Sequence, residues 1–142
     1  MAYVPKTVEK MFVRANTVAY RASGGKIGGS FYNSPVLLLT TTGRKSGKER
    51  TTPLLYLLDE ERYIVVASDR GAPKHPAWYL NLRDHPDVTV QIGSQKISAT
   101  ATEVTGEDRD QLWPRLVEMY QGYDDYTAKT TRTFPIVTFT PK

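Results

Sequence analysis

The 142-residue sequence contains no cysteine, and this absence removes several kinds of chemistry at once. Disulfide bonds, zinc sites with thiolate ligands and a cysteine nucleophile are all excluded, and the usage suits a reducing compartment. Histidine is scarce as well, because His75 and His85 are the only two and a proline follows each of them. We expect both histidines in loops, so the sequence predicts no metal site.

Long apolar runs are also missing from the sequence. No run approaches the roughly 20 residues that a membrane-spanning helix needs, and the N-terminal residues lack the uninterrupted apolar core of a secretory signal. We therefore expect a cytoplasmic protein. Its length suffices for one hydrophobic core, with residues 1–30 as a helix and connector and residues 31–142 as the main domain.

The charge balance is mildly basic, with 19 Lys and Arg residues against 15 Asp and Glu residues and a net charge of +4. Such a balance fits an acidic small molecule, a nucleic acid or an anionic membrane surface as the partner. Charge alone does not choose among these three.

The stretch from residue 36 to residue 58 joins two segments rich in apolar and β-branched residues through a short turn. Gly43 and Gly47 permit the tight backbone that closes a hairpin, so the stretch predicts two antiparallel strands. Pro53 lies inside the second segment and removes one donor of the strand ladder. This predicts an edge or a bulge, where a flat ligand can approach the backbone.

The turn of this hairpin concentrates positive charge, with a single carboxylate, Glu49, set against four cations, Arg44, Lys45, Lys48 and Arg50. Clustered cations, together with the Ser46 hydroxyl and amides freed by glycine, can hold a phosphate or carboxylates. The alternative is a solvated hairpin tip whose charges only prevent edge pairing. The turn alone leaves both interpretations open.

The N-terminal segment predicts an amphipathic helix over residues 7–20, with apolar residues at the spacing of one helical face: Val8, Met11, Phe12, Ala15, Val18 and Ala19. The following residues 23–30 hold four glycines and predict a flexible connector. A helix of this kind usually packs on its own domain. A basic amphipathic helix can also lie on a membrane surface, so peripheral membrane association stays open.

The remaining segments predict further strands at 62–68, 87–92, 96–104 and 135–140, and helices near 77–85, 105–113 and 123–130. Pro114 is expected to break the second of these helices or to open another one through residue 120. About six antiparallel strands with small helices predict a mainly β (α+β) fold, an antiparallel barrel or strongly curled sheet. No strand is followed by a glycine-rich nucleotide loop.

Two further groups of residues could carry chemistry. Ser68 and Asp69 end a predicted strand, and Trp78 on the following helix could flank a planar ring, although it could equally be a core residue. The other group is three tyrosines at every third position, which offer flat apolar area and phenol donors but also suit a core: Tyr120, Tyr123 and Tyr126. No arrangement of serine, histidine and acid predicts a hydrolase, so we expect a bound cofactor to do the hard chemistry.

Several long motifs, in this order, resemble the deazaflavin-dependent nitroreductase family of actinobacteria: LTTTGRKSGKERTTPLLYL, VVASDRG, KHPAWYLNLRDHPDVTVQI, WPRLVEMYQGYDDY and TRTFPIV. The resemblance covers about residues 35–140. It implies a split β-barrel related to flavin-binding folds, and an oxidoreductase that transfers a hydride from the reduced deazaflavin coenzyme F420 to a quinone, enone or nitroaromatic acceptor.

The resemblance also implies roles by position. The coenzyme's phosphate and oligoglutamate tail would be held by Arg44, Lys45, Ser46 and Arg50, in agreement with the anion site expected from the residues alone. The ring and its linker would be lined by Thr52, Pro53, Val66, Ala67, Ser68, Asp69, Ala77, Trp78, Tyr79 and Asn81. The acceptor would lie against Tyr120, Tyr123 and Tyr126, and Ser68 and Tyr123 would be the catalytic candidates.

One position departs from the family's pattern. Where close relatives carry a lysine after the strand-end serine, this chain has Asp69, so Arg70 or Lys74 would have to replace that lysine. The rival hypotheses are an FMN enzyme on the same barrel and a basic barrel that binds single-stranded nucleic acid. Four hairpin cations favour a coenzyme with a long acidic tail over FMN. We expect a small-molecule acceptor, no nucleic acid, and a monomer or weak dimer.

Overall fold

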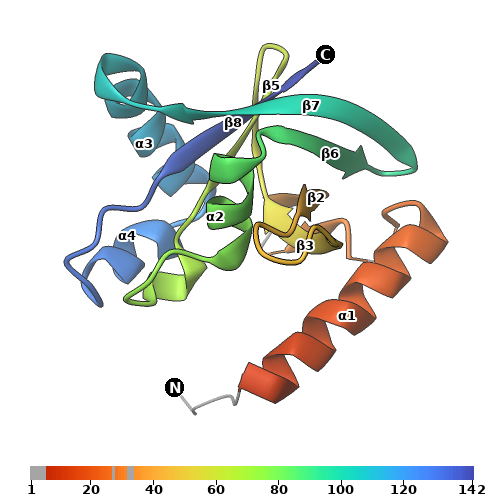
Figure 1. Ribbon diagram of the computed structural model, residues 1–142. Helices are drawn as coiled ribbons and strands as arrows, with labels where there is room; N and C mark the ends of the chain where they lie inside the picture. Colours follow the sequence, from red (N-terminus) through yellow and green to blue (C-terminus); the bar gives the residue numbers. More distant parts are fainter. Residues whose placement is uncertain (1–5, 27, 32–33) are drawn as a thin grey trace.

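The computed structural model of the chain describes residues 6–26, 28–31 and 34–142. Its helical elements are α1 (Lys6–Ser23), the 3-10 turn η1 (Asp69–Gly71), α2 (Ala77–Asp84), α3 (Gly106–Met119) and α4 (Gly122–Thr127). Its strands are β1 (Ser30–Phe31), β2 (Ser34–Thr42), β3 (Glu49–Leu55), β4 (Leu57–Asp59), β5 (Arg62–Val66), β6 (Asp87–Ile92), β7 (Gln95–Val104) and β8 (Ile136–Pro141) (Figure 1).

The strands form one antiparallel sheet that curls into a barrel. The hydrogen-bonded order is β1-β2-β6-β7-β8-β5-β4, and β3 pairs with β2 off this path. Strand β4, at the far end of this order, follows β3 in the chain with only Tyr56 between them. Because β3 pairs with β2, the chain connects the far end of the sheet back to β2. The mainly β split barrel expected from the sequence is thereby confirmed.

Two details of the strands differ from the sequence prediction. The second strand of the predicted hairpin, expected to reach residue 58, is divided at Tyr56, because there the chain leaves its pairing with β2 and joins β5. The short strand β1 begins at Ser30, the last residue of the connector that the glycines predicted to be irregular, and it pairs with the start of β2. Pro53 lies in β3 opposite Leu38 of β2, and among the described residues β3 pairs with β2 alone. The expected edge position of Pro53 is therefore confirmed.

The barrel interior is filled by alternate residues of the strands, which point to the same face because side chains alternate along a strand. Its fully buried members include Leu37, Leu39, Val65, Val90, Val137 and Phe139. The opposite face of β5 and β8 packs against α3 and α4 through a second cluster that includes Ile64, Ile136, Leu112, Leu116 and Phe134. Both faces of β5 and β8 are thus buried, which explains their nearly continuous apolar sequences.

Helix α3 passes through Pro114 without a break, so the predicted interruption is wrong. Pro114 is exposed, while Leu112 and Leu116 on the buried side of the same helix are almost completely excluded from solvent. The apolar packing on both sides of the proline offsets the loss of one backbone donor.

Helix α1 lies along the barrel beside β3 (Figure 1), but not by the face that the sequence predicted. Ala15 is exposed and Val18 is 67% exposed, whereas Thr17 and Tyr20 are buried. The Tyr20 side chain fixes this face, because its hydroxyl donates to the carbonyl oxygens of Val36 and Gln91 and accepts from the Gly93 amide. The predicted apolar side chains of Val8, Met11 and Phe12 lie outside the described part of the chain.

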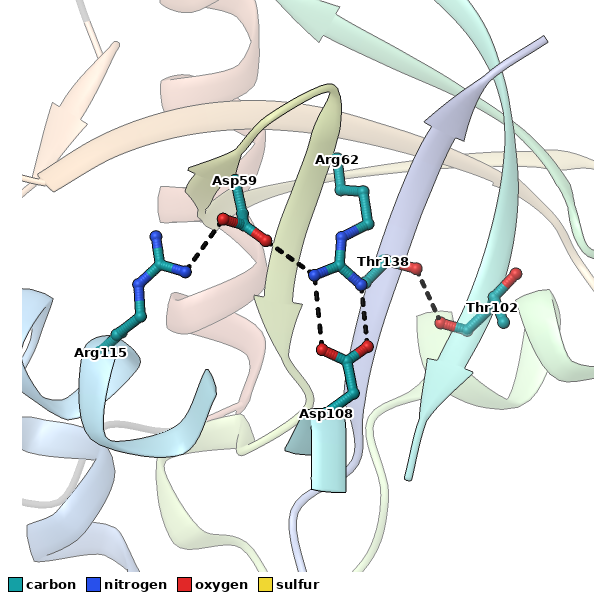
Figure 2. Close-up of polar contacts among 6 residues, drawn as sticks. All are labelled: Asp59, Arg62, Thr102, Asp108, Arg115 and Thr138. Carbon is teal, nitrogen blue, oxygen red and sulfur yellow. Dashed lines mark hydrogen bonds and ion pairs between the residues drawn. The ribbon is translucent and has the colours of Figure 1, made fainter. Parts of the chain in front are cut away.

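Ion pairs attach α3 to the hairpin of β4 and β5. Arg62 bonds to the carboxylates of Asp59 and Asp108, and Arg115 bonds to the other oxygen of Asp59 (Figure 2). Nearby, the Thr138 hydroxyl donates to the Thr102 carbonyl oxygen and links β8 to β7 (Figure 2). Within the described part of the chain, no helix combines the length and the apolar character needed to cross a membrane.

Candidate active site

The turn between β2 and β3 is tight because of its two glycines. The Gly43 amide donates to the Lys48 carbonyl oxygen at 2.8 Å, and the Gly47 amide donates to the Gly43 carbonyl oxygen at 2.9 Å. A Cβ atom at Gly43 would lie 2.7 Å from the Ser46 Oγ, closer than the turn allows. Gly47 has a φ of +71°, which favours glycine. These hydrogen bonds therefore give the cation-bearing turn a compact backbone.

A cleft of about 700 Å³ lies between this turn and the start of α2. Three of its cations, Arg44, Lys45 and Arg50, were predicted, and a fourth, Arg14, comes from α1. Two carboxylates, Glu49 and Asp69, face these four cations. The other residues that line the cleft are Gly43, Ser46, Thr51, Thr52, Pro76, Ala77, Trp78 and Asn81.

Asn81 connects α2 to the turn. This side chain is 5% exposed; its amide nitrogen donates to the Thr41 Oγ1 at 3.2 Å, and its carbonyl oxygen accepts from the Arg44 backbone nitrogen at 3.1 Å. Asn81 was predicted from the resemblance as a ring-lining residue. The structure shows that it also positions the first cation of the turn.

Trp78 combines the two interpretations that the sequence left open. Its side chain is 8% exposed and belongs to the barrel's core cluster, yet it also lines the cleft. A large aromatic side chain held in this way gives the cleft a rigid apolar wall.

The end of β5 leads into η1, where Asp69 and Arg70 have φ angles of 44° and 55°. These left-handed conformations are unusual for residues with a side chain, and they cost free energy that the surrounding packing must offset. Ser68 is buried at 6% exposure, while Asp69 lines the cleft. The substitution of Asp69 for the expected lysine therefore places a carboxylate directly beside the cations.

Arg132 supports this strand end and was not identified from the sequence as a site residue. Its guanidinium donates to the carbonyl oxygens of Ala67, Ser68 and Ala72 at 2.8–3.0 Å. Its Nη1 also lies 3.0 Å from the His75 Nδ1. Burial lowers the pKa of Arg132, and the negative charge of Asp69 opposes that effect. The motif TRTF contains this arginine, but nothing in its spacing indicates which carbonyls it meets.

Some of the predicted coenzyme residues do not line the cleft that the described residues form. Val66 is buried at the end of β5, Ala67 and Ser68 are buried directly after it, and Pro53 is half-buried in β3. The Tyr79 hydroxyl donates to the Glu103 carboxylate, and burial is the main cause that raises the pKa of Tyr79. A role for these residues in binding stays a prediction.

The three predicted acceptor tyrosines do meet one another. The rings of Tyr120 and Tyr123 make an edge contact with centroids 4.9 Å apart, and the hydroxyl oxygens of Tyr120 and Tyr126 lie 2.8 Å apart. Tyr123 is 5% exposed in the cluster formed with α3, and burial raises its pKa. Helix α4, which carries Tyr123 and Tyr126, packs against η1, since a Cβ atom at Gly71 would lie 3.0 Å from the Tyr126 carbonyl oxygen. Contact with an acceptor stays a prediction.

The donor set of the cleft fits a coenzyme with a phosphate and an acidic tail. Arg44, Lys45 and Arg50 supply charge-assisted donors, and Arg14 adds a fourth from α1. Trp78 supplies the flat apolar surface that a planar ring system needs. The hairpin cations that the sequence predicts as an anion site therefore line a cleft large enough for a cofactor.

Comparison with known proteins agrees with this geometry. A family model described as F420H(2)-dependent quinone reductase matches residues 12–141. The chain is 36% identical over 142 residues to the F420H(2)-dependent quinone reductase Rv1261c of Mycobacterium tuberculosis (strain ATCC 25618 / H37Rv). The alignment covers 97% of this chain and 95% of that protein.

Two solved structures are similar along much of the chain. One, an F420-H2 dependent reductase (FDR-A), is 43% identical with a TM-score of 0.68 and covers 74% of this chain and 93% of that one. The other, described as a domain-swapped dimer, is 38% identical with a TM-score of 0.70 and covers 92% and 98%. The resemblance to deazaflavin-dependent reductases is thereby confirmed, and the chain belongs to the F420H(2)-dependent quinone reductase family of oxidoreductases, whose cofactor is coenzyme F420.

Proposed function

We propose that this chain transfers a hydride from reduced F420 to a quinone, or to a related enone or nitroaromatic acceptor, with the coenzyme bound between the β2–β3 turn and α2. One observation carries the proposal. Four cations and the Trp78 side chain, which come from three separate parts of the chain, line a single cleft of about 700 Å³. The printed name of the matching family supports a quinone as the acceptor.

The bound coenzyme would supply the hydride from its reduced ring. The chain's own residues then have three tasks. Arg44, Lys45 and Arg50 bind the acidic end, and Asn81 keeps Arg44 in place through its backbone amide. Trp78 restricts the position of the coenzyme's ring, which favours a geometry close to that needed for hydride transfer.

A quinone or enone that accepts a hydride also needs a proton. We assign this step to Ser68 and Tyr123, the catalytic candidates of the sequence analysis. The Tyr123 hydroxyl is protonated at neutral pH and can donate a proton, although burial raises its pKa and makes it a weaker acid than an exposed tyrosine.

Equilibrium titration with oxidised F420 and, separately, with FMN tests the proposal through tryptophan fluorescence. Trp78 lines the cleft and Trp113 lies on α3, so Trp113→Phe should keep the quenching and Trp78→Phe should lose most of it. Binding of F420 alone, followed by oxidation of its reduced form by quinones, supports the proposal. Binding of FMN alone would overturn the cofactor, and binding of neither would favour the nucleic-acid hypothesis.

The proposal extends to the state of the protein in the cell. We infer a cytoplasmic monomer or weak dimer, and the relative described as a domain-swapped dimer makes the oligomeric state the first property to measure. Light scattering after gel filtration over a range of concentrations distinguishes the two. A stable dimer at low concentration would contradict the inference.

Peripheral membrane association through α1 is a separate part of the proposal. The helix exposes Val18 and Ala15 beside Arg14 and Arg21, a mixture of apolar and basic side chains that suits an anionic surface. Sedimentation with anionic vesicles measures it, with Val18→Asp as the variant that should release the protein. Equal sedimentation of both proteins would remove α1 from this role.

A further inference from the structure

The chain directly after β5 makes a strained turn beside the cleft. The Gly71 amide donates to the Ser68 carbonyl oxygen at 2.9 Å, and the two residues between them, Asp69 and Arg70, have φ angles of 44° and 55°. Two left-handed residues in succession cost free energy, so contacts from outside the turn have to stabilise it. Because Asp69 lines the cleft and Ser68 precedes it, the conformation of this turn sets the position of groups at the cleft's edge.

Arg132 supplies these contacts from outside the turn. Its guanidinium donates to three carbonyl oxygens of the segment 67–72, which include those on both sides of the left-handed pair. Its Nη1 also lies 3.0 Å from the His75 Nδ1. The carbonyl oxygens are acceptors at every ordinary pH. Of these four acceptors, the His75 nitrogen alone can be lost by protonation near neutral pH.

His75 is neutral in this arrangement. Arginine has donors only, so the His75 Nδ1 accepts the hydrogen bond from Arg132 and the ring hydrogen is on Nε2. The ring lies against that of Tyr79, with centroids 4.8 Å apart, which restricts its rotation. A proton on Nδ1 would set two donors and two positive charges against each other. Protonation of His75 therefore removes one of the four acceptors that orient Arg132.

The surroundings of His75 favour the neutral ring at neutral pH. Burial is the largest cause that lowers its pKa below the ordinary value of 6.5, the charges of Arg132 and Arg83 lower it further, and Glu103 partly opposes them. The charged and titratable groups that face the ring or line the same small hollow come from several parts of the chain: Arg44, Lys74, Tyr79, Arg83, Glu103 and Arg132. Cations dominate this set. The ring therefore takes up a proton only as the pH falls below 6.5.

We infer that neutral His75 is a positioning residue for hydride transfer, because it orients Arg132 and thereby fixes the turn that begins at Ser68. Protonation of His75 leaves one donor of Arg132 without its acceptor and the strained turn less firmly held. The rate of transfer should therefore fall in acid, which is opposite to the effect of proton uptake by the acceptor alone. The inference rests on the proposed function, because Ser68 and the cleft beside Asp69 bring the turn into the reaction.

Three variants of the whole chain test the inference. His75→Asn places an amide oxygen near the position of Nδ1 and does not titrate, whereas His75→Ala removes the acceptor. His85→Asn is the control, because it replaces the other histidine, which is exposed and lines no part of the cleft. The single-turnover rate at which a water-soluble quinone oxidises reduced F420 is measured from about pH 5 to about pH 8. Titration of the coenzyme or the quinone is common to all the proteins, so a difference between them belongs to the protein.

The four proteins should have different pH profiles. In the wild type and in His85→Asn, the rate should fall by about three- to tenfold as His75 takes up its proton, the loss expected for one hydrogen bond. His75→Asn should lack this fall. His75→Ala should be slower by a similar factor at every pH, with its affinity for reduced F420 changed by less than about twofold, and His75→Asn should recover most of the rate that His75→Ala loses.

NMR signals of the backbone amides of residues 69–72 give a measurement that needs no turnover. They should titrate together with the His75 ring in the wild type and not in His75→Asn. If they do so while no quinone oxidises reduced F420, the proposed function fails and the coupling of His75 to the turn stands. With normal turnover, an acid fall that persists in His75→Asn, or amide signals that do not follow the His75 ring, would overturn the inference alone. If neither turnover nor the coupled titration is found, both proposals are overturned.

Discussion

The side-chain carbonyl oxygen of Asn81 accepts a hydrogen bond from the backbone nitrogen of Arg44, across 37 positions of sequence. The same side chain donates to the Thr41 hydroxyl oxygen, so one buried amide joins α2 to the end of β2. The direction in which the basic turn leaves the sheet is therefore set by a residue of the opposite wall of the cleft. The conformation of the basic turn and the packing of α2 therefore depend on each other through this contact.

Replacing Asn81 should affect both stability and binding. Asn81→Ala removes the acceptor and leaves the Arg44 amide without a partner, which should lower the free energy of unfolding by about 1–3 kcal/mol. Asn81→Asp keeps an oxygen for the Arg44 amide and should lose less stability than the alanine variant, but its negative charge lines the cleft and should still weaken binding of an acidic coenzyme. Urea denaturation and F420 titration measure the two effects. Wild-type affinity in Asn81→Ala would show that the turn does not need this contact.

Much of the fold and of the site could be predicted because the signals are local. Alternating apolar residues, the glycines of the turn and the edge position of Pro53 are properties of short segments, and the structure confirms them. The cation cluster could be recognised for the same reason, since Arg44, Lys45 and Arg50 are near neighbours in sequence and line the cleft together.

The parts that could not be predicted depend on contacts between distant segments. Arg14 reaches the cleft only because Tyr20 fixes the opposite side of α1 to the sheet, through carbonyls that no sequence pattern marks. Arg132 is 57 to 65 positions from the groups it holds. Pro114 was predicted to interrupt its helix because proline has a low helix propensity. The packing of Leu112 and Leu116, which stabilises the helix on both sides of the proline, could not be read from the sequence.

The two cations at the start of the turn should be distinguishable from a third one nearby. Arg44→Ala combined with Lys45→Ala should weaken F420 binding, most strongly for long tails and at low salt, because the contribution is electrostatic. Lys48→Ala removes one charge of the same turn, against two in the double variant, at a residue that does not line the cleft, so it should weaken binding by clearly less than either Arg44→Ala or Lys45→Ala alone. Calorimetric titrations at low and high salt compare them. Similar losses in all variants would mean that only the net charge of the turn matters.

Buried tyrosines make the stability of the fold sensitive to alkaline pH. Burial raises the pKa of Tyr123 above its ordinary value of 10.0, so its contribution is complete below about pH 10 and is lost as the pH rises through the higher folded value. Tyr123→Phe removes this titration and should lose less stability than the wild type between pH 8 and pH 11. Thermal unfolding at the two pH values measures the difference. Equal losses would show that other groups, such as Tyr56 and Tyr79, dominate.

The same Tyr123→Phe variant tests the proposed catalytic role. It keeps the ring in the cluster with α3, whereas Tyr123→Ala would remove a buried side chain and cost about 3–5 kcal/mol. If the hydroxyl supplies a proton, Tyr123→Phe should lower turnover of the acceptor with little change in F420 affinity. Unchanged turnover would leave Tyr123 a core residue.

The ion pairs shown in Figure 2 should give a modest, pH-dependent contribution to stability. Hydrogen bonds from Arg62 and Arg115 lower the pKa of Asp59 below its ordinary value of 3.8, so the contribution is present above that pH and is lost as the pH falls through the folded value. Asp59→Asn should lower the free energy of unfolding by about 1 kcal/mol at pH 7, and by less near pH 3 or in high salt. Glu61→Gln, an exposed neighbour in the same turn, is the control for denaturation.

Arg14 is the only cleft cation among the described residues that lies on a helix outside the barrel. Seven residues further on, about two helical turns, the helix is tied to β3, where the Arg21 guanidinium donates to the Thr51 Oγ1 at 2.9 Å. Thr51 itself lines the cleft. A ligand that binds Arg14 should therefore also stabilise the docking of α1 on β3, and loss of Arg14 should separate the two effects.

Arg14→Ala should weaken F420 binding by about two- to fivefold at low salt, the range expected for one exposed ion pair, and Arg14→Lys should recover most of the affinity because it keeps the charge. Hydrogen exchange gives the second measurement. Saturating F420 should slow amide exchange in the C-terminal half of α1 in the wild type, and by less in Arg14→Ala. If F420 slows exchange equally in both proteins, the coupling belongs to Arg21 and Thr51. If Arg14→Ala keeps the wild-type affinity, α1 is not part of the coenzyme site, and the β2–β3 turn binds the tail alone.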